Sequence, residues 1–121
     1  MKSSSDPLAL NICTAPGGPV VEITGDLDHD SAPRIRDALA GLDLHPGQQL
    51  VVDLGALTFC DSSGITVLIA ARNLALEAGA DIALAAVPER VRRIFRIVGL
   101  EQVFTTHPTA QEATAAWTPP A

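Results

Sequence analysis

The chain has 121 residues, a length typical of one domain, and a formal net charge of −6, which argues against a nucleic-acid partner. Its hydrophobic fraction of 47% predicts a buried core rather than a disordered chain. No apolar run approaches the roughly 20 residues that cross a bilayer, and the N-terminus lacks the apolar stretch of a signal peptide, so we expect a cytoplasmic protein without a membrane partner.

Short apolar stretches predict four to five β-strands. The first two flank a cluster of turn residues at 15–19, which predicts a hairpin. The third and fourth are almost wholly apolar, which predicts a sheet with both faces covered. The strands are expected at 8–14, 20–25, 49–54, 81–87 and 103–105.

About four helices are expected between and after these strands. The first begins at Asp30 or Ser31, carries Pro33 in its first turn and ends before the turn at 45–47. The others are expected at 63–78, 88–98 and 109–117. Strands that alternate with helices predict a single α/β domain over 7–117, with disordered tails at 1–6 and 118–121.

The run 59–65 lies where the third strand, after a turn at 55–56, gives way to the second helix. Ser62 and Ser63 are expected at its N-cap and first turn, where backbone N–H groups and the helix dipole favour an anion, and Gly64 leaves room for one. One interpretation is that Asp61 and the two serines only cap the helix. The other is that an exposed serine hydroxyl accepts a phosphoryl group.

Three segments resemble those of a known family. Phe59-Cys60-Asp61-Ser62-Ser63-Gly64-Ile65 resembles the F-x-D-S-S-G-L segment of the bacterial anti-sigma factor antagonists, members of the STAS domain family. Residues 25–29 resemble the family's G-E-L-D-H segment, and residues 87–100 resemble its P-x-V-x-R-x-F…G-L segment. The segments occur in the family's order, and the resemblance covers roughly residues 7–117.

The resemblance implies a small mixed β-sheet with helices packed chiefly on one side. It also implies a regulatory protein, without catalytic residues or a cofactor, that binds an anti-sigma factor serine kinase while unphosphorylated and thereby frees a sigma factor. Phosphorylation of Ser62 would end binding, with Ser63 the weaker candidate acceptor, and a PP2C-type phosphatase would reverse it. The sequence departs from the family at Thr66, where glycine is frequent, so the kinase is expected to approach that turn differently.

Acidic residues follow the second strand at Asp26, Asp28 and Asp30. If the second and third strands are parallel neighbours, these carboxylates share an edge of the sheet with Asp61 and Ser62, and the resemblance matches Asp28 to an acidic residue near the phosphosite. A phosphoserine there would add repulsion toward an acidic partner. The alternative is a solvated loop in which Asp30 caps the helix.

The second helix is apolar on more than one side. One line of residues has core spacing. This line is Ile65, Leu68, Ile69 and Leu76. A second line lies nearly opposite and is either buried as well or a docking surface on which Val67 and Leu74 contact the partner. This line is Val67, Ala71, Leu74 and Ala78.

A cluster of arginines marks the third helix, which has a core stripe of Val91, Ile94, Phe95 and Val98. The arginines are either the solvated face of an amphipathic helix or a surface that meets an acidic patch on a partner. They are Arg90, Arg92, Arg93 and Arg96.

Other functions find less support. Ser62 with His29 as base would suggest a hydrolase, but the run lacks the G-x-S-x-G pattern of a nucleophile elbow, and the three histidines show no supporting spacing. Asp53 ends a strand as the phosphoacceptor of a receiver domain does, but Lys2, the only lysine, is not placed as in receivers. A small nucleotide-binding module would need a P-loop or G-x-G-x-x-G, and neither is present.

The two cysteines, Cys13 and Cys60, have neither the number of a disulfide framework nor the spacing of a metal site. Cys60 stands two residues before Ser62, so either it fills the core as a small hydrophobe or it senses oxidation.

Overall fold

A computed structural model describes residues 8–118. The tails expected at 1–6 and 118–121 lie outside these residues, apart from Thr118. In chain order the elements are β1 (Ala9–Ala15), β2 (Gly18–Leu27), α1 (Ala32–Ala40), β3 (Gln49–Cys60), α2 (Ser62–Glu77), β4 (Asp81–Ala85), α3 (Glu89–Val98), β5 (Thr105–His107) and α4 (Ala110–Ala116).

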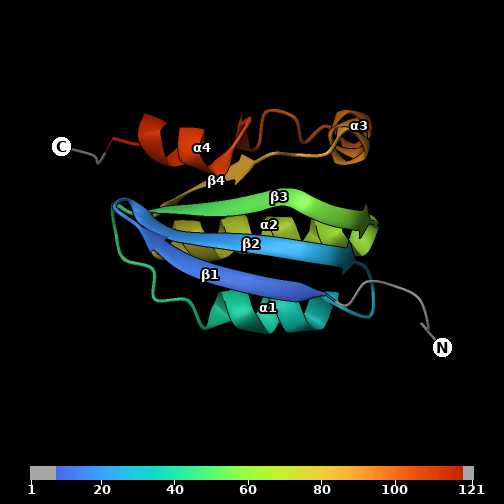
Figure 1. Ribbon diagram of the computed structural model, residues 1–121, viewed down its shortest axis with the longest axis horizontal. Helices are drawn as coiled ribbons and strands as arrows, with labels where there is room; N and C mark the ends of the chain where they lie inside the picture. Colours follow the sequence, from blue (N-terminus) through green and yellow to red (C-terminus); the bar gives the residue numbers. More distant parts are fainter. Residues whose placement is uncertain (1–7, 119–121) are drawn as a thin grey trace.

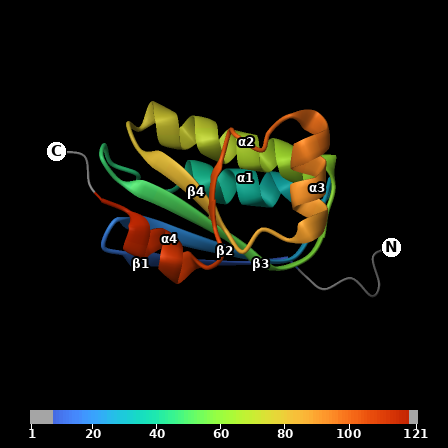
Figure 2. The same ribbon diagram turned by 90° about the horizontal axis from the view of Figure 1, so that it is seen from above.

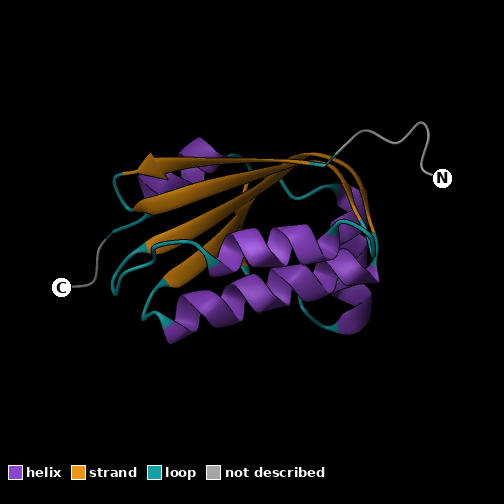
Figure 3. Cartoon of the chain, turned by 90° about the horizontal axis from the view of Figure 1, so that it is seen from below, coloured by secondary structure: helices purple, strands orange, loops and turns teal. Residues whose placement is uncertain are grey.

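The five strands form one mixed sheet in the order β1-β2-β3-β4-β5. β1 and β2 are antiparallel, which confirms the predicted hairpin, whereas β2, β3, β4 and β5 run parallel to one another. α1 and α2 lie side by side on one face of the sheet (Figure 3). α4 covers part of the other face, and α3 lies near the end of the sheet at which β3 finishes (Figures 1 and 2). The predicted mixed α/β fold is therefore confirmed.

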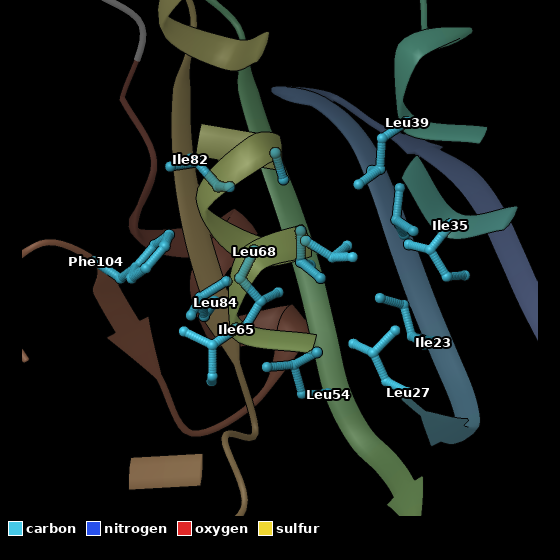
Figure 4. Close-up of a cluster of buried hydrophobic side chains, with 14 of the residues drawn as sticks. Ile23, Leu27, Ile35, Leu39, Leu54, Ile65, Leu68, Ile82, Leu84 and Phe104 are labelled. Carbon is cyan, nitrogen blue, oxygen red and sulfur yellow. The ribbon is translucent and has the colours of Figure 1, made fainter. Parts of the chain in front are cut away.

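The core follows from the alternation of side chains along the strands. Successive side chains of a strand point to opposite faces of the sheet. Those on one face, such as Ile23, Leu54 and Leu84, point toward α1 and α2 and form the main apolar cluster (Figure 4). Those on the opposite face, such as Val51 and Ala83, form a smaller cluster under α4. The interior strands are thus covered on both faces, which explains why their sequence is almost wholly apolar.

β3 is twice as long as the sequence predicts. The expectation of a turn at 55–56 is wrong, because the strand runs through these residues and has 12 residues in all, from Gln49 to Cys60. Its pairing with β2 shifts at two places, between Glu22 and Thr24 and between Gly25 and Asp26, and each shift places one extra β3 residue against β2. Such bulges bend a strand and increase its twist, and they let β3 continue where a regular ladder was not expected.

The end of α4 is tied to the β1–β2 turn. A Cβ added to Gly17 would lie 2.5 Å from Cδ1 of Trp117, so the indole rests directly on the glycine backbone. Trp117 is the only tryptophan in the chain.

The buried face of α2 lies between the two apolar lines seen in the sequence. The stripe passes through Gly64, Leu68, Ala71 and Ala75. The expectation that Leu76 belongs to the core is wrong, because this residue is 49% exposed. The core stripe of α3 is likewise too long, because Val98 in its last turn is 55% exposed.

We predict that Leu68→Ala lowers the free energy of unfolding by about 2–5 kcal/mol, because it opens a cavity where the side chain is 1% exposed. Leu76→Ala is the matched control, since the same atoms are removed from an exposed position of the same helix, and it should change stability by less than about 1 kcal/mol. Urea denaturation followed by circular dichroism measures both values. Equal losses would contradict the assignment of the two faces.

Candidate functional site

The candidate site lies where β2 and β3 end together. Leu27 is opposite Cys60, and the N–H of Asp61 donates to the carbonyl of Leu27 at 3.3 Å. Thr58, the extra β3 residue at the second shift, donates its hydroxyl to a carboxylate oxygen of Asp26 at 2.6 Å. The expectation that β2 and β3 are parallel neighbours is confirmed, so the loop after β2 and the start of α2 meet at one edge.

Asp61, rather than Ser62, is the N-cap of α2. Its Oδ1 atom accepts hydrogen bonds from the N–H groups of Ser63 at 2.8 Å and Gly64 at 3.3 Å, and its carbonyl accepts from Ile65 at 3.2 Å. Two of the N–H groups expected to favour an anion, those of Ser63 and Gly64, are therefore bonded to a carboxylate of the chain itself. This geometry is a strong side-chain cap.

Ser62 is the first residue of α2 and its side chain is exposed, whereas Ser63 is half-buried. The carbonyl of Ser62 accepts a hydrogen bond from the hydroxyl of Thr66 at 3.1 Å. Thr66 is exposed one turn further along the helix. The two serines are adjacent in sequence but differ in access to solvent.

Gly64 is buried, and it serves packing rather than access to the site. A Cβ at this position would lie 2.5 Å from Sγ of Cys60 and 3.0 Å from Cγ of Leu27. The first turn of α2 can therefore press against the ends of β2 and β3 only because position 64 has no side chain.

The loop between β2 and α1 is held by Ser31, which is only 7% exposed. Its hydroxyl donates to the carbonyl of Asp26 at 2.7 Å and accepts from the N–H of Asp28 at 2.9 Å. Oδ1 of Asp28 in turn accepts from the N–H groups of Asp30 and Ser31, both at 3.0 Å. Ser31 is the N-cap residue of α1, as one of the two expectations has it, but its side chain makes no capping hydrogen bond there. Asp30, the other expected cap, does not occupy this position.

A recess of about 180 Å³ lies beside Ser63, between the N-terminal halves of α1 and α2. Its lining residues are His29, Ala32, Pro33, Arg36, Ser63 and Thr66. Arg36 is not among the residues predicted for the site, because only the packing of α1 beside α2 brings it to this recess. Among residues 8–118, no group of three or more histidine, cysteine or acidic side chains is arranged to hold a metal ion.

The apolar docking residues expected on α2 are not available as expected. Val67 is fully buried, so the expectation that it contacts a partner is wrong. Leu74 is half-buried and packs against the core cluster. Periodicity alone did not distinguish these positions, because α2 packs against both α1 and the sheet.

The receiver-domain alternative loses support from the position of Asp53. Asp53 does not end its strand but lies inside β3, where its carboxylate accepts a hydrogen bond from the N–H of Gly55 at 2.9 Å. A receiver domain would need this carboxylate at the strand end. In the described part of the chain, no helix is both long and apolar enough to cross a bilayer.

Cys60 is buried at the end of β3. Burial raises the pKa of its thiol from 9.0 to about 11, and the charge of Asp61 acts in the same direction while that of Arg90 acts against it. At neutral pH the group is an uncharged thiol, which is the poorly reactive form. These properties favour the packing role of Cys60 over oxidation sensing.

We predict that Gly64→Ala destabilises the fold by about 1–3 kcal/mol, because the new methyl group meets Cys60 and Leu27. Gly41→Ala is the control, because its Cβ would find only ordinary contacts of 3.6 Å or more. A Cys60→Ala change in the Gly64→Ala background should restore part of the loss. Strict additivity of the two changes in urea denaturation would contradict the contact.

We predict that, in a Cys13→Ser background, the remaining thiol reacts with iodoacetamide at pH 8 far more slowly in folded protein than in urea. Cys60→Ser leaves the exposed Cys13, which should react quickly in both states. Because the folded protein holds the Cys60 proton more tightly, stability is expected to fall as pH rises from about 9 to about 11, and less so in Cys60→Ser. Fast labelling of folded Cys60 would contradict its burial.

Comparisons with known proteins identify relatives of this chain. A family model described as "Mlab, STAS domain" matches residues 12–106. The anti-sigma-B factor antagonist of Bacillus subtilis (strain 168) is 31% identical over 83 residues, which cover 69% of this chain and 75% of that protein. The anti-sigma-B factor antagonist of Listeria monocytogenes is 27% identical over 81 residues, covering 67% and 71% of the two chains.

Among solved structures, the crystal structure of an anti-sigma factor antagonist from Mycobacterium paratuberculosis matches with a TM-score of 0.74 and 25% identity, covering 91% of this chain and 93% of the other. These relatives are named as antagonists, which is a regulatory rather than an enzymatic role. Together, the family model, the sequence relatives and the fold show that the chain belongs to the STAS-domain family of anti-sigma factor antagonists.

Proposed function

We propose that this protein is a cytoplasmic anti-sigma factor antagonist that docks through the edge of the sheet bearing Ser62. Its partner is an anti-sigma factor that is also a serine kinase, and binding of the unmodified protein frees the sigma factor. The observation that carries the proposal is the exposed Ser62 hydroxyl on the first residue of α2, beside the loop that Ser31 and Asp28 close.

Access and backbone geometry support Ser62 as the phosphoacceptor. Ser62 is exposed, whereas the half-buried Ser63 lines the recess between α1 and α2. A kinase must bring the hydroxyl within reach of the γ-phosphate of ATP, which an exposed side chain on a fixed helix start allows. Ser63 is the alternate acceptor, and a PP2C-type phosphatase would reset the switch.

The charge of the added group explains how modification would end binding. A phosphoserine carries about −1.5 to −2 charges at pH 7. Because Asp61 already accepts hydrogen bonds from the N–H groups of Ser63 and Gly64, the new phosphate would lie beside a carboxylate that competes for these donors. The phosphate would therefore face the partner, where repulsion and desolvation costing about 3–4 kcal/mol weaken affinity by two to three decades.

The contact surface is expected to comprise Ser62, Ser63 and Thr66 on α2 together with the carboxylates of Asp26 and Asp28. Asp26 and Asp28 are half-buried and hold Thr58 and the loop backbone, so they also shape the surface. Val67 is removed from this set because it is buried. Leu74 is removed as well, because it packs against the core cluster and lies about 18 Å along α2 from Ser62.

We predict that Ser62→Asp weakens binding to the anti-sigma factor kinase at least about a hundredfold, whereas Ser62→Ala binds and resists phosphorylation. The probes are the recombinant anti-sigma factor kinases of the source genome, tested by retention on immobilised protein and by mass spectrometry after incubation with ATP. Circular dichroism should be unchanged in both variants, because the side chain is exposed.

Ser63→Ala is the matched control and should remain a substrate. An acyl-phosphate on Asp53 would instead support a receiver domain. The proposed function would be refuted if the immobilised wild-type protein retained none of these kinases and none of them phosphorylated it.

A further inference from the structure

Several exposed apolar side chains lie on α3 or in the segments that adjoin it. Large apolar residues that stand well out of the described core include Phe59, Ile97, Val98 and Val103. Ile97 is 78% exposed and Phe59, at the end of β3, is 42% exposed. An isolated exposed apolar residue is ordinary, but several around one helix need an explanation.

This surface is continuous with the strand end that leads to Ser62. The guanidinium of Arg90 donates to the carbonyl of Thr58 at 3.3 Å, which places the first turn of α3 against the residue before Phe59. The positive charge of Arg90 also acts to lower the pKa of the Cys60 thiol, two residues from Ser62. Two views show α3 near the end of the sheet where β3 finishes (Figures 1 and 2).

Helical spacing extends the surface along α3. Arg90, Ile94 and Ile97 stand at i, i+4 and i+7, so they follow one face of the helix away from Thr58. Ile94 is half-buried and Ile97 is exposed, which makes the middle of this face a bridge between the core and the surface. Arg93 borders the same face one turn before Ile97.

The charge of α3 is opposite to that of the rest of the chain. Four arginines and one glutamate give the helix a formal charge of +3, which leaves −9 on the remainder of a chain whose total is −6. Glu89 is paired with Arg96 at 3.3 Å, so it neutralises only one of the four. An apolar stripe that begins at Arg90 and has Arg93 along one side is complementary to an apolar ridge bordered by carboxylates.

We propose that Phe59 and the Arg90–Ile94–Ile97 face of α3 form the apolar half of the docking surface, and that this half receives an apolar ridge bordered by carboxylates on the anti-sigma factor. The inference rests on the proposed function and extends it to a specific partner chemistry. It supplies the exposed apolar contacts that Val67 cannot provide. This partner chemistry also explains how phosphorylation would weaken binding. Carboxylates of the partner that are bound near α3 would be repelled by a phosphate on Ser62.

The test compares two variants of this surface with two controls of the same chemistry. Ile97→Ser and Arg93→Glu change the proposed surface at exposed positions. Leu76→Ser removes an exposed leucine about 21 Å along α2 from Ser62, and Arg34→Glu makes the same charge reversal at an exposed position of α1. Isothermal titration calorimetry with the kinase that retains the wild-type protein gives the dissociation constants.

Each surface variant is expected to bind at least about tenfold more weakly, and each control within about twofold of the wild type. The loss in Arg93→Glu should shrink at high salt, while the loss in Ile97→Ser should persist. Unchanged urea midpoints show that the variants are folded.

Wild-type affinity in both surface variants, with binding still lost in Ser62→Asp, overturns this inference and leaves the proposed function standing. Equal losses in the controls overturn it too. A dimer in light scattering that Ile97→Ser converts to a monomer assigns the face to a second copy of the chain instead. Absence of any retained kinase overturns the proposed function, and this inference with it.

Discussion

The site depends on the parallel pairing of β2 with an unusually long β3. Two shifts in the pairing let β3 continue to Cys60, so that Cys60 stands opposite Leu27 and Asp61 is bonded to the Leu27 carbonyl. The last residues of both strands are thereby fixed to each other before either loop begins. The Asp28 loop, Ser62 and the start of α3 meet at one edge because the two strands end together.

The carboxylate of Asp61 caps the start of α2, so the N–H groups of Ser63 and Gly64 are not free donors. Asp61 bonds to Ser63 and Gly64, and Gly64 allows the turn to lie against Cys60. The helix start is therefore stable without any bound anion. A phosphoryl group placed there would meet negative charge, which suits a switch that acts on a partner rather than on the fold.

Much of the fold could be predicted from local patterns, and the errors have physical causes. Turn residues announced the hairpin, and apolar runs announced the buried strands. The glycine and alanine at 55–56 looked like a turn, but pairing with β2 kept them in a strand, which is a tertiary effect. The faces of α2 were misjudged at Val67 and Leu76 because burial was decided by the position of α1 beside it.

The site itself was only partly visible in the sequence. The run at 59–65 marked Ser62, but the hydroxyl of Ser31 was seen as a cap although it closes a loop. Arg90 was seen as one of four arginines, and only the packing of α3 on Thr58 relates it to the strand end. The contact between Arg90 and Thr58 joins residues 32 positions apart, and no local sequence pattern records it.

The indole of Trp117 on Gly17 belongs to the opposite end of the molecule, beside the β1–β2 turn, whereas Ser62 begins where β3 ends (Figure 1). As the sole tryptophan, it dominates the intrinsic fluorescence of a chain that has no tyrosine. The emission spectrum should thus register unfolding while staying silent to events at the serine, so the protein carries its own reporter for separating loss of structure from loss of recognition.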